Sequence, residues 1–205
     1  MVTPAPIKIS GIIINIDAEK QAERALKDRA ERDSLTKLLN KSAAKKYVEE
    51  YINRQDEMIN CALLVIDLDN FKYYNDTFGH DVGDMLLKEI SKILMEQSAE
   101  EGFVARFGGD EFLIILEYAD AERAMQKARN VLNEILSRNA FTKEIQSFLG
   151  CEGIVIPEEK RVSCSIGVAT MPEVKDDNDI SKAIKRADKA LYGIKHSTKC
   201  DCKLA

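Results

Sequence analysis

Residues 103–118 read FVARFGGDEFLIILEY, which is two apolar runs around a glycine-rich turn. The runs cover residues 103–107 and 112–118, and the four residues between them include two glycines. This arrangement predicts a β-hairpin. The turn holds the adjacent carboxylates of Asp110 and Glu111, which repel each other unless a cation is present. Because Asp and Gly are also common turn residues, the turn alone leaves a purely structural role open.

A second acidic group follows a strand pattern upstream of this hairpin. Residues 61–66 (CALLVI) are continuously apolar, as in a central strand buried on both faces, and Asp67, Leu68 and Asp69 follow directly. A carboxylate there is costly unless it is paired or holds a cation, although Asp also ends strands without such a role. If the strand continues, Asp67 and Asp69 point to one face. If it lies beside the hairpin, the carboxylates converge and suit Mg²⁺, the ion of phosphoryl transfer.

The rest of the chain alternates helix and strand patterns. Apolar residues recur at helical spacing over residues 42–52, 82–95, 120–136 and 179–195, and residues 162–168 alternate as a strand does. Residues 139–161 show no clear element except a short strand at 153–156. We therefore predict an α/β (α+β) fold, with a central mixed, largely antiparallel sheet flanked by helices.

The first 33 residues differ from the remainder. Residues 11–16 (GIIINI) have a strand pattern, and residues 18–33 are rich in Ala, Glu, Lys and Arg, with only a thin apolar stripe. We predict a linker helix over residues 18–33, either paired with a copy of itself or solvated as a spacer. The compact domain then covers residues 34–205.

Composition narrows the class of function. The formal net charge of −5 argues against a broad nucleic-acid surface, so we expect no nucleic-acid partner. No apolar run is long enough to cross a bilayer and no signal peptide is visible, so we expect no membrane segment in this chain. The five cysteines fit free thiols in a reducing cytosol, which favours a cytoplasmic location.

A polar cluster fills residues 70–84 (NFKYYNDTFGHDVGD). Lys72 could meet a phosphate as a point charge. Asn75 and Asp84 offer the amide and carboxylate groups that complement the edge of guanine. Each residue also has a structural interpretation: Lys72 as a solvated loop lysine, Asn75 as a turn former, Asp84 as an acid favoured in the first turn of a helix, and His80 as a capping or packing residue.

Five motifs, in order, resemble the GGDEF family, the diguanylate cyclases. They are residues 33–40 (DSLTKLLN), 66–84 (IDLDNFKYYNDTFGHDVGD), 106–112 (RFGGDEF), 165–169 (SIGVA) and 187–195 (ADKALYGIK). Their order and spacing make the resemblance specific, and it covers about residues 33–199. It implies a fold like the palm of nucleotide cyclases and polymerases.

The resemblance also implies a role for each matching residue. Asp67, Asp110 and the backbone carbonyl of Leu68 would hold Mg²⁺ (or Mn²⁺) with help from Glu111. Asp110 would accept the proton of the 3′-hydroxyl, and Lys72 would stabilise charge on the phosphates. The remaining substrate contacts would come from Asn75, Asp84 and His80 for guanine, the backbone N–H groups of Asn70 and Phe71 for phosphate, and the cations Lys195 and Lys199 for phosphate.

The implied reaction condenses two GTP molecules into cyclic di-GMP and releases two pyrophosphates. Each protomer binds one GTP, and a homodimer, which can be transient, brings each 3′-hydroxyl to the other α-phosphate. The alternative is a catalytically silent module that binds GTP or acts in regulation. A cyclase with relaxed base choice fits less well, because the Asp84 carboxylate matches guanine and would meet adenine poorly.

The chain departs from the family pattern in places. Lys37 stands where the family has Gly, Lys41 where it has Arg, and residues 198–200 read TKC in place of Gly-Arg-Asn, so Lys199 keeps the charge without the bidentate fork. Residues 99–102 read AEEG in place of Arg-x-x-Asp, which predicts no primary product-inhibition site. Residues 11–26 resemble the end of a PAS sensor domain and its exit helix, which implies a PAS remnant over residues 1–17 and an upstream sensor domain.

Overall fold

The computed structural model describes residues 17–53, 60–98, 101–171, 177–197 and 199–205. Residues 1–16, which include the strand pattern of residues 11–16 and all but the last residue of the predicted PAS remnant (residues 1–17), lie outside the described residues. Within the described part, no helix combines the length and apolar character that crossing a bilayer requires.

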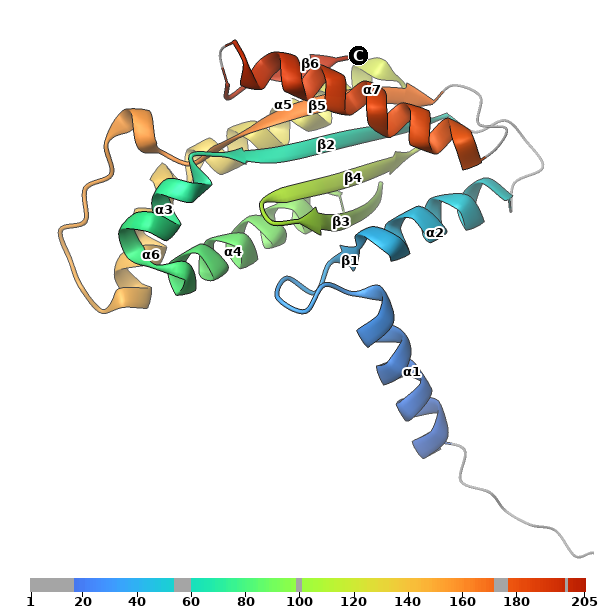
Figure 1. The fold of residues 1–205 in the computed structure, drawn as a ribbon, viewed down its shortest axis with the longest axis horizontal. Coiled ribbons are helices and arrows are strands. Elements are labelled where there is room, and N and C mark those ends of the chain that lie inside the picture. The colour runs from blue at the N-terminus through green and yellow to red at the C-terminus, as the bar shows by residue number, and fades with distance from the viewer. Residues whose placement is uncertain (1–16, 54–59, 99–100, 172–176, 198) are drawn as a thin grey trace, which may run out of the picture.

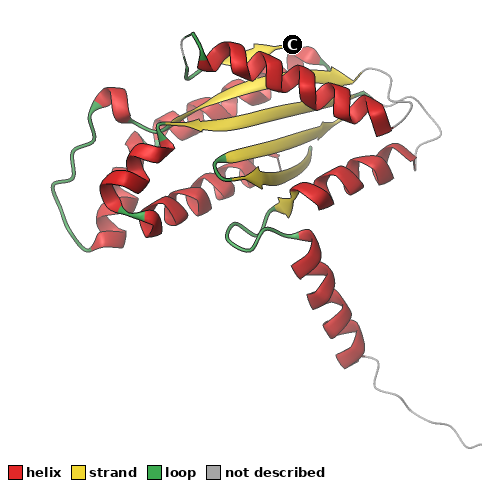
Figure 2. Cartoon of the chain, viewed as in Figure 1, coloured by secondary structure: helices red, strands yellow, loops and turns green. Residues whose placement is uncertain are grey.

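The described strands form one six-stranded sheet in the order β1-β3-β4-β2-β5-β6 (Figures 1 and 2). The strands are β1 (Leu39–Asn40), β2 (Cys61–Asp69), β3 (Gly102–Gly108), β4 (Glu111–Glu117), β5 (Ser163–Met171) and β6 (Cys202–Leu204). The three central pairings, β3–β4, β4–β2 and β2–β5, are antiparallel, and the two outer pairings are parallel. The prediction of a mixed, largely antiparallel sheet is confirmed.

Helices cover both faces of this sheet (Figure 1). The described helices are α1 (Asp17–Glu31), which extends away from the sheet, α2 (Lys41–Asn53), α3 (Phe71–Phe78), α4 (His80–Ser98), α5 (Ala121–Ser137), α6 (Thr142–Leu149) and α7 (Asp177–Lys195), with single 3₁₀ turns η1 (Asn139–Phe141) and η2 (Glu158–Lys160). One core contains residues of α4 and α5 packed on the sheet, and the other contains residues of α2 and α7.

Strand β2 runs through the middle of the molecule and contributes to both cores. Because side chains alternate along a strand, Leu64 and Ile66 pack in the core with α4 and α5, while Leu63 and Val65 pack in the core with α2 and α7. Every residue from 61 to 66 is buried, which confirms the prediction of a central strand covered on both faces. The strand delivers Asp67 and Asp69 to the end of the sheet.

Two parts of the predicted element order were wrong. Residues 71–78, for which the sequence predicted no element, form helix α3, whose Phe71, Tyr74 and Phe78 contact the core. Residues 139–161 contain η1, α6 and η2, and the strand predicted at 153–156 is absent from these described residues. Helices α3 and α6 have 8 residues each, which is shorter than the window in which a helical period is detected.

Candidate active site at the end of the central strand

The hairpin lies beside β2, and this brings the two acidic groups together. Strand β4 pairs antiparallel with β2, and Asp67 stands opposite Glu111. The N–H of Leu68 donates to the carbonyl of Asp110 at 3.3 Å, which fixes the turn against the strand end. The expected convergence of carboxylates is therefore present.

Lys195, at the end of α7, reaches into this acidic group. Its Nζ donates to Asp67 Oδ1 and, at 3.3 Å, to the backbone carbonyl of Leu68, and it lies 3.1 Å from Asp69 Oδ1. Asp67 Oδ1 and the Leu68 carbonyl are two of the atoms predicted to hold a metal. The ammonium group of Lys195, which is a cation, therefore already contacts these two predicted metal-binding atoms.

Asp69 anchors the surrounding backbone and is almost fully buried, at 1% exposure. Its Oδ2 accepts hydrogen bonds from the hydroxyls of Ser163 (3.2 Å) and Ser165 (2.9 Å) and from the backbone N–H of Cys200 (3.1 Å). One carboxylate thus joins β2, β5, α7 and the segment that leads into β6. Sequence reasoning placed Asp69 beside Asp67 but did not find this anchoring role, because its partners are 94 to 131 residues away.

The protonation equilibria of these groups reflect burial and crowding. Burial raises the pKa of Asp67, the charges of Asp110 and Asp69 add to the rise, and Lys195 opposes it. Burial likewise raises the pKa of Glu111, followed by the charges of Asp67 and Asp110. Burial disfavours the charged form of Lys195, but its bonds and charge contacts with Asp67 and Asp69 outweigh burial and raise its pKa. Such a cluster is stabilised by added positive charge.

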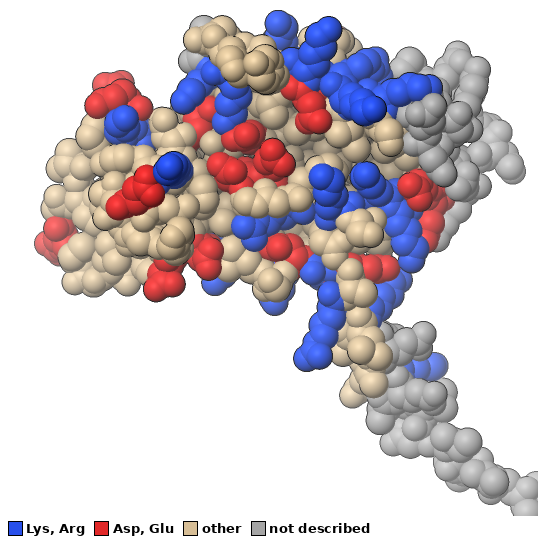
Figure 3. All heavy atoms as spheres, viewed as in Figure 1, with Lys and Arg blue, Asp and Glu red and all other residues tan. Residues whose placement is uncertain are grey.

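A cavity of about 460 Å³ opens beside this cluster. Eight of the predicted site residues line it: Asp67, Leu68, Asn70, Phe71, Lys72, Asp110, Lys195 and Lys199. Tyr73, Asp76 and Lys160 line it as well and were not predicted. Figure 3 shows acidic side chains near the centre of this face, between groups of basic ones. A carboxylate centre with a lysine rim suits a phosphate chain accompanied by a divalent cation.

Four predicted residues lie outside the lining of this cavity. Glu111 lines a neighbouring cavity of about 330 Å³ together with Lys41 and Asp188. The other three belong to the packed pair of helices α3 and α4: Asn75, His80 and Asp84. The Asn75 amide lies over Gly83, because a methyl group added at Gly83 would come within 1.9 Å of Asn75 Oδ1. Gly83 is therefore the residue that lets α3 present Asn75 next to Asp84.

The hairpin turn is fixed from its other side by Arg106. The Arg106 guanidinium donates twice to the Gly109 carbonyl, at 3.0 and 2.7 Å, and once to Asp33 Oδ1 at 3.0 Å. Asp33 Oδ1 also accepts from the backbone N–H and the hydroxyl of Thr36, both at 2.8 Å. These bonds connect the segment after α1 to the turn that carries Asp110. The sequence motifs quoted above contain all of these residues, but the spacing of the motifs does not indicate that Arg106 bonds to Asp33.

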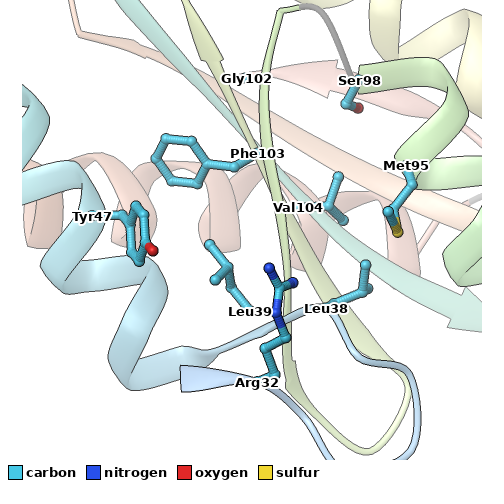
Figure 4. A pocket seen from close by; sticks show the side chains of 9 residues that line it. All are labelled: Arg32, Leu38, Leu39, Tyr47, Met95, Ser98, Gly102, Phe103 and Val104. Carbon is cyan, nitrogen blue, oxygen red and sulfur yellow. The ribbon is translucent and has the colours of Figure 1, made fainter. Parts of the chain in front are cut away.

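A different cavity, shown in Figure 4, is unsuited to a charged substrate. It measures about 380 Å³ and lies between the end of α1 and elements β1, α2, α4 and β3, with mostly apolar side chains such as Leu38, Phe103 and Val104 around it. None of the predicted site residues lines it. The cavity at the end of β2 is therefore the candidate active site.

The residues at that site fit a divalent metal ion. In the part of the chain that the structure describes, no three His, Cys, Asp or Glu side chains are grouped as a complete metal site. Mg²⁺ does not need such a group, because it is commonly held by one or two carboxylates together with substrate phosphates. Asp67 and Asp110 supply the carboxylates and Leu68 a carbonyl, and the ammonium of Lys195 on Asp67 and Leu68 shows that these atoms attract a cation.

Comparison with known proteins gives the same family as the resemblance seen in the sequence motifs. Residues 30–200 match the family described as diguanylate cyclase, GGDEF domain. The signaling protein YkoW of Bacillus subtilis is 34% identical over 206 residues, which are 97% of this chain and 24% of that protein. A diguanylate cyclase of Vibrio cholerae is 29% identical over 204 residues, 98% of this chain and 58% of that protein. The cyclic di-GMP phosphodiesterase PdeR of Escherichia coli is 33% identical over 88% of this chain and 25% of that protein. This chain spans less than two thirds of each of these relatives.

Solved structures share the fold. The coiled coil and GGDEF domain of DgcB from Caulobacter crescentus, solved with c-di-GMP, has a TM-score of 0.74 at 22% identity over 93% of both chains. The diguanylate cyclase SiaD from Pseudomonas aeruginosa, solved with its activator SiaC, has a TM-score of 0.70 at 27% identity over 92% of this chain and 66% of that one. The predicted cyclase-like palm is confirmed.

Proposed function

The chain belongs to the GGDEF domain family, and we propose on this basis that it is the catalytic domain of a diguanylate cyclase. It condenses two GTP molecules into cyclic di-GMP and releases two pyrophosphates. The observation that carries the proposal is the cavity at the end of β2, where Asp67 and the Leu68 carbonyl hold the Lys195 ammonium group, Asp110 lines the same cavity and lysines form the rim.

The residues of the site divide into three tasks. Asp67, Asp110 and the Leu68 carbonyl, assisted by Glu111, would hold Mg²⁺ or Mn²⁺, which supplies charge neutralisation at the phosphates when bound. Lys72, Lys195 and Lys199 bind the phosphate chain, together with the backbone N–H groups of Asn70 and Phe71. The guanine base is read by Asn75, Asp84 and His80 at the α3–α4 pair.

The transfer step depends on positioning and charge. Asp110 accepts the proton of the attacking 3′-hydroxyl as the new phosphodiester bond forms at the α-phosphate of the other GTP and pyrophosphate leaves. Lys72 stabilises the charge that develops on the phosphates. As the family resemblance implies, each protomer binds one GTP, and a homodimer brings the two GTP molecules together.

The organisation of the chain follows from the same proposal. Residues 34–205 form the catalytic domain and residues 18–33 a linker helix. Residues 1–17 are the end of a PAS sensor domain that controls pairing of protomers in a longer signalling protein, and this part of it lies in the cytoplasm. Residues 99–102 lack a product-inhibition site.

A catalytically silent GTP-binding module is the second candidate. It is favoured by the match to PdeR, a protein named as a phosphodiesterase, since similarity of this degree also occurs in a protein named for a different activity. The first candidate is preferred because Asp67, Asp110, Glu111 and Lys72 are all present.

The test is to incubate the purified chain with GTP and Mg²⁺ at high protein concentration and to follow cyclic di-GMP and pyrophosphate. Asp110→Ala should abolish both products, whereas Glu96→Ala, on the exposed side of α4, should leave them unchanged. GTP binding without product in the parent would favour the silent module.

A further inference from the structure

Lys160 lines the same cavity as the predicted phosphate-binding lysines but comes from a different part of the chain. It belongs to η2, within residues 139–161, the stretch in which the sequence showed no clear element except a short strand. Its side chain is exposed, and among the described residues it takes part in no ion pair. None of the tasks in the proposed function uses it.

The backbone on both sides of Lys160 is fixed to the site. Asn70 Nδ2 donates to the carbonyl of Glu159 at 3.2 Å and to the carbonyl of Arg161 at 2.9 Å. The N–H of Lys160 donates to the Pro157 carbonyl at 2.9 Å, which closes the 3₁₀ turn. The position of Lys160 is therefore set by Asn70, the residue that immediately follows β2.

A second anchor holds the end of the same segment. The N–H of Val162 donates to the Tyr74 hydroxyl at 2.9 Å, and this hydroxyl donates to the Ala140 carbonyl at 3.4 Å. Tyr74 is fully buried in α3, so both ends of residues 140–162 are attached to the helix that carries the predicted nucleotide-binding residues. Residues 140–162 are therefore fixed to the candidate active site through α3.

The charges around the cavity show what Lys160 would bind. Lys195 is already paired with Asp67 and Asp69. Lys199 stands where the family has an arginine. This chain therefore lacks, at that position, a guanidinium group that could bind two phosphate oxygens at once. An unpaired ammonium group beside the same cavity adds a donor for an anion.

We propose that Lys160 binds the phosphate chain of the nucleotide beyond its α-phosphate, and that Asn70 positions it by holding η2. This inference rests on the proposed function, because it takes the nucleotide site to be the cavity at the end of β2. It adds a substrate-binding residue supplied by the segment between α5 and β5.

The direct test measures the affinity of the Mg²⁺-loaded full chain for 3′-deoxy-GTP, which lacks the attacking hydroxyl, and for GMP. Lys160→Ala should weaken 3′-deoxy-GTP binding about 5-fold, the loss expected for one exposed charge-assisted hydrogen bond, and change GMP binding less than about 2-fold. Lys143→Ala is the matched control, because Lys143 is exposed on α6 in the same segment and does not line the cavity.

The role of Asn70 is tested by a double-mutant cycle. Asn70 has a φ of 62°, so Asn70→Gly keeps the left-handed backbone and its N–H group while removing the side chain that holds η2. In the Asn70→Gly background, Lys160→Ala should lower the affinity by a further factor of less than about 2. The reason is that the Asn70 side chain acts by positioning Lys160, so both substitutions disrupt the same interaction with the nucleotide. Melting curves confirm that each variant is folded.

The outcomes separate this inference from the proposed function. If the parent binds 3′-deoxy-GTP and Lys72→Ala weakens binding while Lys160→Ala does not, the role of Lys160 is wrong and the nucleotide site stands. Equal losses for Lys143→Ala and Lys160→Ala, or fully additive effects with Asn70→Gly, would also overturn it. A parent chain that binds no nucleotide overturns both proposals.

Discussion

Lys195 donates to the two atoms, Asp67 Oδ1 and the Leu68 carbonyl, that the proposed function assigns to a metal ion. Under the proposed function, the ammonium group and a divalent ion would therefore compete for this position in the nucleotide-free protein. With nucleotide and metal bound, Lys195 would contact the phosphate chain in place of Asp67.

Replacing Lys195 by Met tests this competition. Lys195→Met should tighten Mn²⁺ binding to the nucleotide-free chain about 10-fold, because the loss of a charged hydrogen bond to Asp67 frees the carboxylate, and it should weaken binding of 3′-deoxy-GTP. Titration calorimetry gives both affinities, with the exposed Lys189→Met on the same helix as control. An unchanged Mn²⁺ affinity would show that the ammonium does not occupy the metal position.

Asp33 gives a prediction for the pH dependence of stability. Burial alone would raise its pKa, but hydrogen bonds from Thr36 and Arg106 outweigh burial and hold the pKa below the ordinary value of 3.8. Asp33 therefore stabilises the fold above pH 3.8, and this contribution is lost as the pH falls through the lowered pKa.

Asp33→Asn should accordingly lower the free energy of unfolding by about 2 kcal/mol at pH 7, the scale of charge-assisted hydrogen bonds, and by less at pH 2, which lies below the ordinary pKa of 3.8. Urea unfolding at the two pH values measures the difference. A difference of the same size at both would mean that the Asp33 charge plays no part in anchoring the turn.

Single residues were predictable where a strand or turn pattern fixed their neighbours. Asp67, Asp110 and Lys72 line the cavity as the resemblance implies. The anchoring role of Asp69 and the placement of Lys160 could not be predicted, because their partners are dozens of residues away and are brought close only by the register of β5 and the contacts of Asn70.

Helices α3 and α4 form the element on which the proposed base recognition depends. Gly83 packs beneath the Asn75 side chain, so Gly83→Ala should displace that side chain. We expect 3′-deoxy-GTP affinity to fall about 10-fold from the loss of hydrogen bonds to the base, while stability stays the same or rises by up to about 1 kcal/mol, since Ala favours a helix interior over Gly.

Binding and thermal unfolding of Gly83→Ala measure the two effects separately, with the exposed Lys88→Ala on α4 as control. Unchanged affinity in Gly83→Ala would remove Asn75 from base recognition. A large loss of stability would instead point to a wider rearrangement of the helix pair.

Strand β6 depends on the buried carboxylate of Asp69. Asp69→Asn removes the negative partner of Lys195 and weakens the acceptor of the Cys200 N–H, so it should cost about 3 kcal/mol of stability, as breaking a buried ion pair does. Hydrogen exchange of the Cys200 amide should accelerate more than that of β4 amides. Equal acceleration in both places would contradict a specific link to the C-terminal segment.

Among the helices and strands, the spacing of apolar residues predicted correctly those elements that bury a continuous apolar face. Strand β2, with all of residues 61–66 buried, was identified correctly. Helices α3 and α6 were missed because 8 residues are too few to establish a helical period, and β1 and β6 were missed because strands of two and three residues leave no period to detect.

For the whole molecule, the arrangement of the sheet places the candidate active site at one end, and under the proposed function one chain would bind one of the two GTP molecules. The central antiparallel strands place the acidic cluster at one end of the sheet, and helix α1 extends away from the body (Figure 1). Leu26 on α1 is 66% exposed. The mixed and largely antiparallel character of the sheet was predictable from the sequence. The order of the strands was not, because the outer parallel pairings come from the short strands β1 and β6.

The central claim is that two chains condense two GTP molecules at the Asp67–Asp110 site. The most direct measurement is the initial rate of cyclic di-GMP formation from GTP and Mg²⁺ as the protein is diluted, with pyrophosphate counted alongside. We expect two pyrophosphates for each cyclic di-GMP and a rate per chain that falls on dilution, as the dimer dissociates. GTP bound at the site with no cyclic product at any protein concentration would contradict it.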